Sequence, residues 1–347
     1  MNLRYVAIIL VAVIVVEALA IGYMALNNNQ LSETLSQLQS EYRKLQSEYQ
    51  ALVGEYRQFT TAIYPLTLID DANRVITISS EPLRIVSLAP SITEILFTLN
   101  LSDRVLGVTM FCDYPPIVNE MKEKGRLTVI GGYWDPDAEK IIGLRPDLVI
   151  GYASVSPHVD LAERLTALNI TVMLLYPHNL HEVFNNIILI GKATGKLVEA
   201  QKLVQQLEAR VNSTIEKIKN LPKIKVYYEI WFDPIWTTGP GTFIDELISL
   251  AGGINVFGDA KTMGVVVSYE DVVNRNPDVI VLPDTYMKEF SISKEQVISR
   301  PGWSAINAVK NDRIYFIDED IVVRPGPRLV EGLEVLARLI HPEAFGG

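Results

Sequence analysis

The sequence is poor in the residues that build disulfides and metal sites. Its 347 residues include one cysteine, Cys112, so the chain can form neither an internal disulfide nor a thiolate zinc cage. Its four histidines show no His-Glu-x-x-His spacing, the pattern of a zinc-binding helix. The sequence therefore predicts no metal site and no resident cofactor.

Positive charge and catalytic signatures are also scarce. Lysine and arginine number 31 against 41 aspartate and glutamate residues, a net charge of -10. A nucleic-acid partner would need a basic face, so none is predicted. The segment "GPGT" lacks the Lys-Ser/Thr ending of a phosphate-binding loop, and no Ser-His-Asp order or paired carboxylates mark an active site. The protein is predicted not to be an enzyme.

Apolar residues are concentrated near the N-terminus. Residues 5–26 carry one charge, Glu17, and as a helix they would span roughly 33 Å, which matches a bilayer core. A cleaved signal peptide usually has a shorter apolar core, so an uncleaved transmembrane anchor is predicted. Because Arg4 precedes this span, residues 1–4 are expected to be a cytoplasmic tip. The predicted localisation is the cell membrane, single-pass, with the bulk of the chain extracytoplasmic.

Residues 27–63 are predicted to form a coiled-coil stalk. Apolar residues recur there at alternating spacings of four and three, from Leu31 to Ile63. Glutamates recur at one flanking position, but no cation recurs at the other. Two interpretations stay open, which are self-association through the stalk and a single amphipathic spacer.

Beyond the stalk, short apolar segments alternate with amphipathic ones, which is typical of parallel α/β units. An early helix carries a predicted capping box, Ser91 with Glu94. One long helical pattern interrupts the alternation, with Gly191 and Gly195 as candidate kinks. The predicted fold class is α/β, with two Rossmann-like lobes joined by one long backbone helix. The predicted boundaries are 65–180 for the N-terminal lobe, 181–221 for the connecting helix and 222–347 for the C-terminal lobe.

One short pattern occurs twice, about 130 residues apart, as "EKIIGLRPDLVIG" from Glu139 and "EDVVNRNPDVIVL" from Glu270. In each copy a helix is predicted to begin at the glutamate, to end before Pro-Asp, and to lead into a strand buried on both faces. The helix dipole favours an acidic residue in a first turn, but it does not explain a matched pair with matched spacing.

Four longer blocks follow one another within residues 82–341. They are "RIVSLAPSITEILFTLNLSDRVLGVTMFCDYPP", "GGYWDPDAEKIIGLRPDLVIG", "EIWFDPIWTTGPGTFIDELISLAGGINVF" and "RPGWSAINAVKNDRIYFID". Together they resemble the substrate-binding proteins of ABC importers for cobalamin and ferric siderophores. The resemblance implies two α/β lobes bridged by a helix, as the pattern also predicts. It further implies that Glu139 and Glu270 match the glutamates that pair with arginines on the two permease subunits, a contact that mainly sets orientation and on-rate.

The resemblance also implies a ligand site in the cleft between the lobes. The residues that fall by motif where cobalamin binders contact their ligand are Phe111, Tyr133, Tyr152, Trp236 and Arg324. Aromatic walls would supply rigid contact area to a broad chelate, and Arg324 could fork onto a carboxylate, a phosphate or an amide carbonyl. Trp134 joins this set because it lies in a Gly-Gly and Asp-Pro loop where burial would be difficult.

Three further aromatic residues have open roles. Tyr114 and Trp231 either line the site or pack in the core, and His158 is a weaker candidate for contact with the metal centre of a ligand. Where cobalamin binders place a further tryptophan, this chain has Gly264, so one aromatic wall is missing. The segment "CDYPP" still favours a corrinoid over a siderophore or haem.

The sequence thus predicts a membrane-anchored extracytoplasmic protein that captures cobalamin, or a related corrinoid, and delivers it to an ABC importer. A ferric siderophore, haem or another metal chelate is the alternative ligand, and a tethered ligand-sensing receptor is the alternative role. The predicted partners are the permease dimer through Glu139 and Glu270, the small-molecule ligand, and the membrane through residues 5–26.

Overall fold

The computed structural model describes residues 37–44, 46–47 and 64–346, and the chain divides into two units, Met1–Thr61 and Ala62–Gly347. In the first unit, residues 37–44 and 46–47 are helical. The predicted anchor, residues 5–26, and most of the predicted stalk lie outside the described residues. No helix among the described residues is both long and apolar enough to cross a bilayer.

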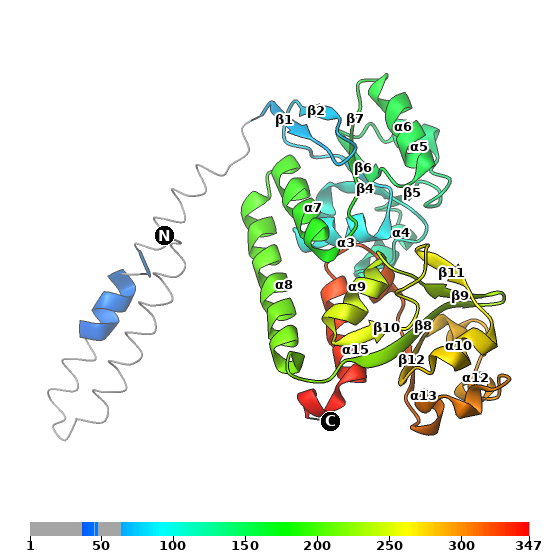
Figure 1. Ribbon diagram of the computed structural model, residues 1–347. Helices are drawn as coiled ribbons and strands as arrows, with labels where there is room; N and C mark the ends of the chain where they lie inside the picture. The colour runs from blue at the N-terminus through cyan, green and yellow to red at the C-terminus, as the bar shows by residue number, and fades with distance from the viewer. Residues whose placement is uncertain (1–36, 45, 48–63, 347) are drawn as a thin grey trace. The chain divides into compact units, whose positions relative to one another are not determined.

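The N-terminal part of the second unit is an α/β lobe, here called the N-lobe (Figure 1). Its sheet has the order β5-β4-β3-β6-β7 with every pair parallel, and a hairpin of β1 and β2 precedes it. The strands are β1 (Leu66–Ile69), β2 (Val75–Ile78), β3 (Ile85–Ser87), β4 (Val105–Val108), β5 (Thr128–Val129), β6 (Leu148–Tyr152) and β7 (Thr171–Leu175). The helices are α3 (Pro90–Thr98), η1 (Ser102–Arg104), α4 (Ile117–Glu123), α5 (Ala138–Gly143) and α6 (Ser156–Thr166).

The C-terminal part is a second α/β lobe, the C-lobe. Its sheet has the order β11-β9-β8-β12-β13, and β10 also pairs with β8. Strands β10, β8, β12 and β13 run parallel, whereas β9 and β11 join antiparallel at one edge. The strands are β8 (Ile224–Phe232), β9 (Ile235–Thr238), β10 (Gly253–Asn255), β11 (Gly264–Val266), β12 (Val279–Pro283) and β13 (Ile314–Ile317). The helices are α9 (Phe243–Leu250), α10 (Tyr269–Arg275), α11 (Thr285–Lys288), α12 (Lys294–Ile298), η2 (Trp303–Ala305), α13 (Asn307–Lys310), α14 (Asp320–Val323), α15 (Leu329–Ile340) and η3 (Pro342–Phe345).

The connection between the lobes differs from the prediction. The segment expected as one helix over 181–221 forms two, α7 (Leu180–Ala193) and α8 (Leu197–Ile218). Gly195 between them has a φ of +72°, a left-handed conformation that glycine adopts readily and that ends a helix. Gly191 lets the two helices pack closely, because a Cβ there would lie 2.4 Å from the Cβ of Ala200. The bridging helix is therefore α8, whose 22 residues span roughly 33 Å and which lies along α15 (Figure 1).

Side-chain packing also joins the lobes. One buried apolar cluster contains residues of both, including Ile92 and Leu96 of α3 together with Leu333 and Leu336 of α15. The other two clusters each lie within one lobe. A core shared in this way resists separation of the lobes, because separation would expose apolar surface to water.

The repeated sequence pattern produces the same local structure in each lobe. Helix α5 leads through Pro146-Asp147 into β6, and α10 leads through Pro277-Asp278 into β12. The residue before each proline, Arg145 or Asn276, is left-handed, with φ of 47° and 45°. The backbone N–H of Asp147 donates to Arg84 O, directly before β3, and that of Asp278 donates to Lys225 O in β8. The predicted path from helix to buried strand is confirmed, except that each helix begins one residue before its glutamate.

Candidate functional site

Three of the predicted ligand residues come together at the carboxyl ends of N-lobe strands. Phe111 and Trp134 are 51% and 65% exposed, and Tyr133 is half-buried. Tyr133 and Trp134 contact each other edge to face, with ring centroids 4.8 Å apart. The Phe111 ring lies beside Gly132, since a Cβ built there would be 3.5 Å from it. This arrangement presents aromatic surface to solvent from two neighbouring loops.

His158 supports this aromatic surface from beneath. Its imidazole is fully buried, accepts the Tyr152 N–H at Nδ1 (3.1 Å) and donates from Nε2 to the Tyr133 carbonyl (2.9 Å). Burial lowers the pKa of His158 to about 4, so it is neutral near pH 7. The idea that His158 contacts the metal centre of a ligand is wrong for this conformation, because both ring nitrogens are engaged inside the lobe.

The C-lobe contributes aromatic residues from its antiparallel edge. Trp236 on β9 is 40% exposed and pairs in register with Trp231 on β8. Trp236 also covers Gly264, where a Cβ would lie 3.2 Å from its ring. Trp231 packs on Phe232 and Phe290, with centroids 4.7 and 5.1 Å away. Figure 1 shows β9 and β11 on the side of the C-lobe toward the N-lobe.

Tyr152 does not line an open surface. It is 3% exposed, and its hydroxyl bonds Ser91 Oγ (2.8 Å) and donates to Pro325 O of the C-lobe (3.3 Å). The next C-lobe residue, Gly326, approaches α3 so closely that a Cβ would lie 3.3 Å from the Cβ of Ser91. The predicted role of Tyr152 as a ligand contact needs correction for this conformation, because the side chain seals the boundary between the lobes.

Arg324 lies at the same boundary and is already engaged by carboxylates. Its guanidinium lies 2.5 Å from Asp113 Oδ1, 2.8 Å from Asp320 Oδ2 and 3.5 Å from Glu94 Oε1. The Arg324 side chain is 14% exposed. Burial works against its charge, but the three carboxylates outweigh burial and raise its pKa. It is therefore not a free cation.

The predicted capping box on α3 is wrong, and the reason exposes residues that sequence reasoning missed. Helix α3 begins at Pro90, with Ala89 as N-cap and no side-chain cap. The Ser91 and Glu94 side chains point instead to the C-lobe boundary, where Glu94 binds Arg328. A charged residue within the apolar run "SITEILF" was the available signal, because buried charges are normally paired.

Arg328 connects several side chains at the boundary. It binds Glu94 through two hydrogen bonds of 3.0 and 2.9 Å and lies 3.4 Å from Asp318. Its guanidinium also stacks over the Tyr114 ring at 4.1 Å from the centroid, so Tyr114 contacts the C-lobe while remaining 40% exposed. Glu94, Asp113, Asp318 and Asp320 together make the boundary rich in carboxylates. Burial raises the pKa of one of them, Asp320, to about 6 even though Arg324 opposes this effect.

Glu139 and Glu270 occupy matching positions in the two lobes. Each is the second residue of a short helix, α5 or α10, behind an N-cap residue (Asp137 or Ser268) whose side chain accepts backbone N–H groups. Both side chains are exposed, and neither forms an ion pair with another described residue. Two exposed, unpaired carboxylates on equivalent helices are suited to a partner with two cationic sites.

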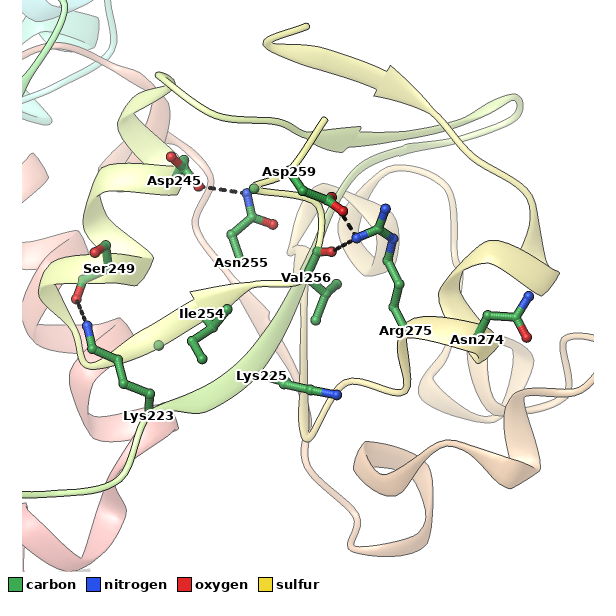
Figure 2. A pocket seen from close by; sticks show the side chains of 12 residues that line it. Lys223, Lys225, Asp245, Ser249, Ile254, Asn255, Val256, Asp259, Asn274 and Arg275 are labelled. Carbon is green, nitrogen blue, oxygen red and sulfur yellow. Dashed lines mark hydrogen bonds and ion pairs between the residues drawn. The ribbon is translucent and has the colours of Figure 1, made fainter. Parts of the chain in front are cut away.

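A recess of about 900 Å³ lies elsewhere, on the C-lobe alone (Figure 2). Lys223, Asn255 and Arg275 lie on its wall, where Lys223 donates to Ser249 O and Arg275 pairs with Asp259. None of the six predicted ligand residues lines it. Within residues 37–44, 46–47 and 64–346, no three histidine, cysteine, aspartate or glutamate side chains are grouped so that they could hold a metal ion.

Comparisons with known proteins agree with this architecture. Residues 85–321 match the family described as "Periplasmic binding protein". The chain is 38% identical over 291 residues, 82% of this chain and 88% of the relative, to the uncharacterized ABC transporter substrate-binding lipoprotein YvrC of Bacillus subtilis. It is 29% identical over 252 residues, 72% of this chain and 86% of the relative, to a vitamin B12-binding protein of Vibrio cholerae. The structure of the periplasmic heme-binding protein RhuT from Roseiflexus sp. RS-1 superposes with a TM-score of 0.67 at 27% identity, covering 75% of this chain and 98% of that chain.

The fold is that of a two-lobed binding protein. The chain belongs to the periplasmic binding protein family, among the substrate-binding proteins of ABC importers. This family consists of binding proteins rather than enzymes, in agreement with the predicted absence of catalysis.

Proposed function

We propose that this protein captures cobalamin, or a related corrinoid, between its lobes and delivers it to an ABC importer outside the cytoplasm. The observation that carries the proposal is the exposed aromatic surface on both lobes, with Phe111 and Trp134 on one and Trp236 on the other. Large exposed aromatic groups supply rigid contact area for a broad, partly apolar ligand. Similarity to the vitamin B12-binding protein of Vibrio cholerae supports the choice of ligand.

Haem is the alternative ligand, because the Roseiflexus structure is that of a heme-binding protein. A haem site of the usual kind needs an axial side chain on the iron, most often histidine. The histidine nearest the aromatic surface, His158, is buried and engaged at both nitrogens. This observation favours a chelate that brings its own metal ligands, such as a corrinoid or a siderophore.

A substitution pair tests the location of the ligand. In calorimetric titrations of the full chain with cyanocobalamin, Trp236→Ala should weaken binding about tenfold or more, because an aromatic wall is lost. Leu168→Ala, which shortens an apolar side chain that is 54% exposed, is the control and should leave binding unchanged. Equal affinities of the two variants for cyanocobalamin would show that the ligand does not bind at the lobe boundary.

Docking on the permease is assigned to Glu139 and Glu270, each of which would pair with a cationic group of one permease subunit. Charge reversal of both residues should abolish stimulation of the importer's ATPase by the liganded protein, since each lobe would then repel its partner. Glu163→Arg reverses an exposed acid on α6 and is the control. Undiminished stimulation by the doubly reversed protein would exclude this docking surface.

Residues 5–26 are proposed to hold the protein in the membrane, with residues 27–63 as a stalk that raises the lobes above it. Hydropathy and length support this assignment. The full chain should remain with membranes after alkaline carbonate extraction, whereas a chain lacking residues 5–26 should be released. Release of both would contradict an integral anchor.

A further inference from the structure

The lobe boundary has no uncompensated cation among its described ion pairs. Two guanidinium groups, those of Arg324 and Arg328, face the carboxylates of Glu94, Asp113, Asp318 and Asp320. The pairs therefore carry more negative than positive charge. A ligand that approaches this boundary with a carboxylate edge meets arginines that are already neutralised and acids that repel it.

Asp113 differs in its position from the other two counter-ions of Arg324, Glu94 and Asp320. It stands between Cys112 and Tyr114, two residues after the exposed Phe111, on the N-lobe loop that carries part of the aromatic surface. Its side chain is 46% exposed, compared with 26% for Asp320 and 2% for Glu94. It makes the shortest ion pair to Arg324, 2.5 Å from Oδ1 to Nη1. Of the three counter-ions of Arg324, Asp113 is the one a ligand can reach most easily.

We propose that Asp113 is a specificity-determining residue that keeps Arg324 paired and thereby selects ligands with a neutral, amide-bearing edge over ligands with a carboxylate edge. The proposal rests on the proposed function, since it assumes that a chelate binds at this boundary. It narrows the ligand class to chelates whose periphery consists of carboxamides.

The chemistry of the pair explains the selection. A carboxamide can donate an N–H to Asp113 and accept from an N–H of Arg324 that remains free, so it can bind without breaking the pair. A carboxylate can only accept, so at the same N–H it would offer no proton to Asp113 and would place a second negative charge beside it, which repels. A ligand with a carboxylate edge, such as haem, meets this repulsion at Asp113, whereas an amide edge does not.

Two ligands that differ by one charge test the proposal. The probes are cyanocobalamin and its monocarboxylic acid, in which one side-chain amide is hydrolysed, each titrated calorimetrically into the full chain. The wild-type protein should prefer the amide form by about tenfold, which is about 1.4 kcal/mol. Asp113→Asn, which keeps the shape and removes the charge, should reduce this preference to about twofold or reverse it.

The ratio of the two affinities separates selection from a structural role. A variant that only loosened the boundary would weaken the binding of both ligands equally and leave the ratio of their affinities unchanged. Asp103→Asn removes an exposed acid that lies 3.8 Å from Arg126 and should retain the wild-type ratio. A wild-type protein without preference, or an unchanged ratio in Asp113→Asn, overturns the role of Asp113 while corrinoid binding stands.

A titration with haem distinguishes failure of the corrinoid proposal from failure of the proposed role of Asp113. If wild-type protein binds neither cobalamin form but binds haem, the proposed ligand is wrong and the selection is overturned too, because a dicarboxylate enters with Asp113 in place. If haem binds Asp113→Asn and not wild-type protein, the selection by Asp113 is supported although the corrinoid is not. Absence of binding by every probe to both proteins overturns both proposals.

Discussion

The carboxylate of Glu94, on the N-lobe helix α3, forms a two-point ion pair with the guanidinium of Arg328, at the start of the C-lobe helix α15. The Glu94 and Arg328 side chains are 2% and 11% exposed. Two parallel N–H···O bonds fix the relative orientation of the partners as well as their separation. The pair therefore holds the lobes at the edge of the proposed ligand site.

Removing one partner of this pair should be costly. Glu94→Gln leaves the Arg328 charge largely buried without its main counter-ion, so the free energy of unfolding should fall by about 3 kcal/mol. Chemical denaturation monitored by circular dichroism measures the change.

Glu334→Gln provides a matched comparison, because Glu334 makes the same two-point contact with Arg210, between α15 and α8, in a more exposed place. It should cost about 1 kcal/mol or less. Equal losses for the two variants would show that burial does not set the strength of the interlobe pair.

His158 should make stability depend on pH below neutrality. Its folded pKa, about 4, lies below the ordinary value of 6.5, so between these values the unfolded chain binds a proton that the folded protein does not. The free energy of unfolding should therefore fall by about 3 kcal/mol as pH drops from 6.5 to 4. The stabilising contribution is fully present only above pH 6.5.

Variants isolate this contribution. His158→Gln should lose this part of the pH dependence, whereas His178→Gln, which replaces an exposed histidine, should keep it. Denaturation curves at several pH values provide the comparison. A pH slope in His158→Gln as steep as in the wild-type protein would contradict a buried neutral imidazole.

Gly264 should be required for the position of Trp236. A Cβ at residue 264 would lie 3.2 Å from the Trp236 ring, so Gly264→Ala must push the ring aside. An off-rotamer side chain costs about 0.5–1.5 kcal/mol, so cyanocobalamin should bind about 2–10 times more weakly. Gly143→Ala is the control, because a Cβ there meets no atom within 4 Å. Unchanged affinity in Gly264→Ala would mean that the ligand does not use the Trp236 ring in this position.

The lobes should close little when ligand binds. A shared apolar core, the Glu94–Arg328 pair and a hydrogen bond from the Leu180 N–H to Glu246 all join them. Small-angle X-ray scattering with and without cyanocobalamin should give the same radius of gyration within error. A clear contraction on ligand addition would show that these contacts break or rearrange.

Much of the fold could be predicted because it depends on local patterns. The repeated glutamate-to-Pro-Asp segments predicted equivalent helices and buried strands in two lobes, because proline and apolar runs act within a few residues. At Gly195 the sequence predicts only a candidate kink. The complete break into two helices depends on the packing of α7 on α8. In this packing Gly191 lies against Ala200, and that contact is not local in sequence.

The site was less predictable because its side chains interact across the lobes. Phe111, Trp134 and Trp236 are exposed, and for Trp134 the loop position predicted this. Tyr152 and Arg324 looked equally suitable, but the partners that engage them, Pro325 for Tyr152 and Asp113 for Arg324, are 173 and 211 residues away in sequence. A pairing at that separation leaves no local pattern in the chain.

The measurement that tests the account most directly is a calorimetric titration of the full chain with cyanocobalamin, with a ferric siderophore and haem in parallel. We expect binding of one cyanocobalamin per chain with a submicromolar dissociation constant, and weaker binding of the other two. Tight binding of a siderophore or haem without binding of cyanocobalamin would contradict the corrinoid assignment and leave the family unchanged.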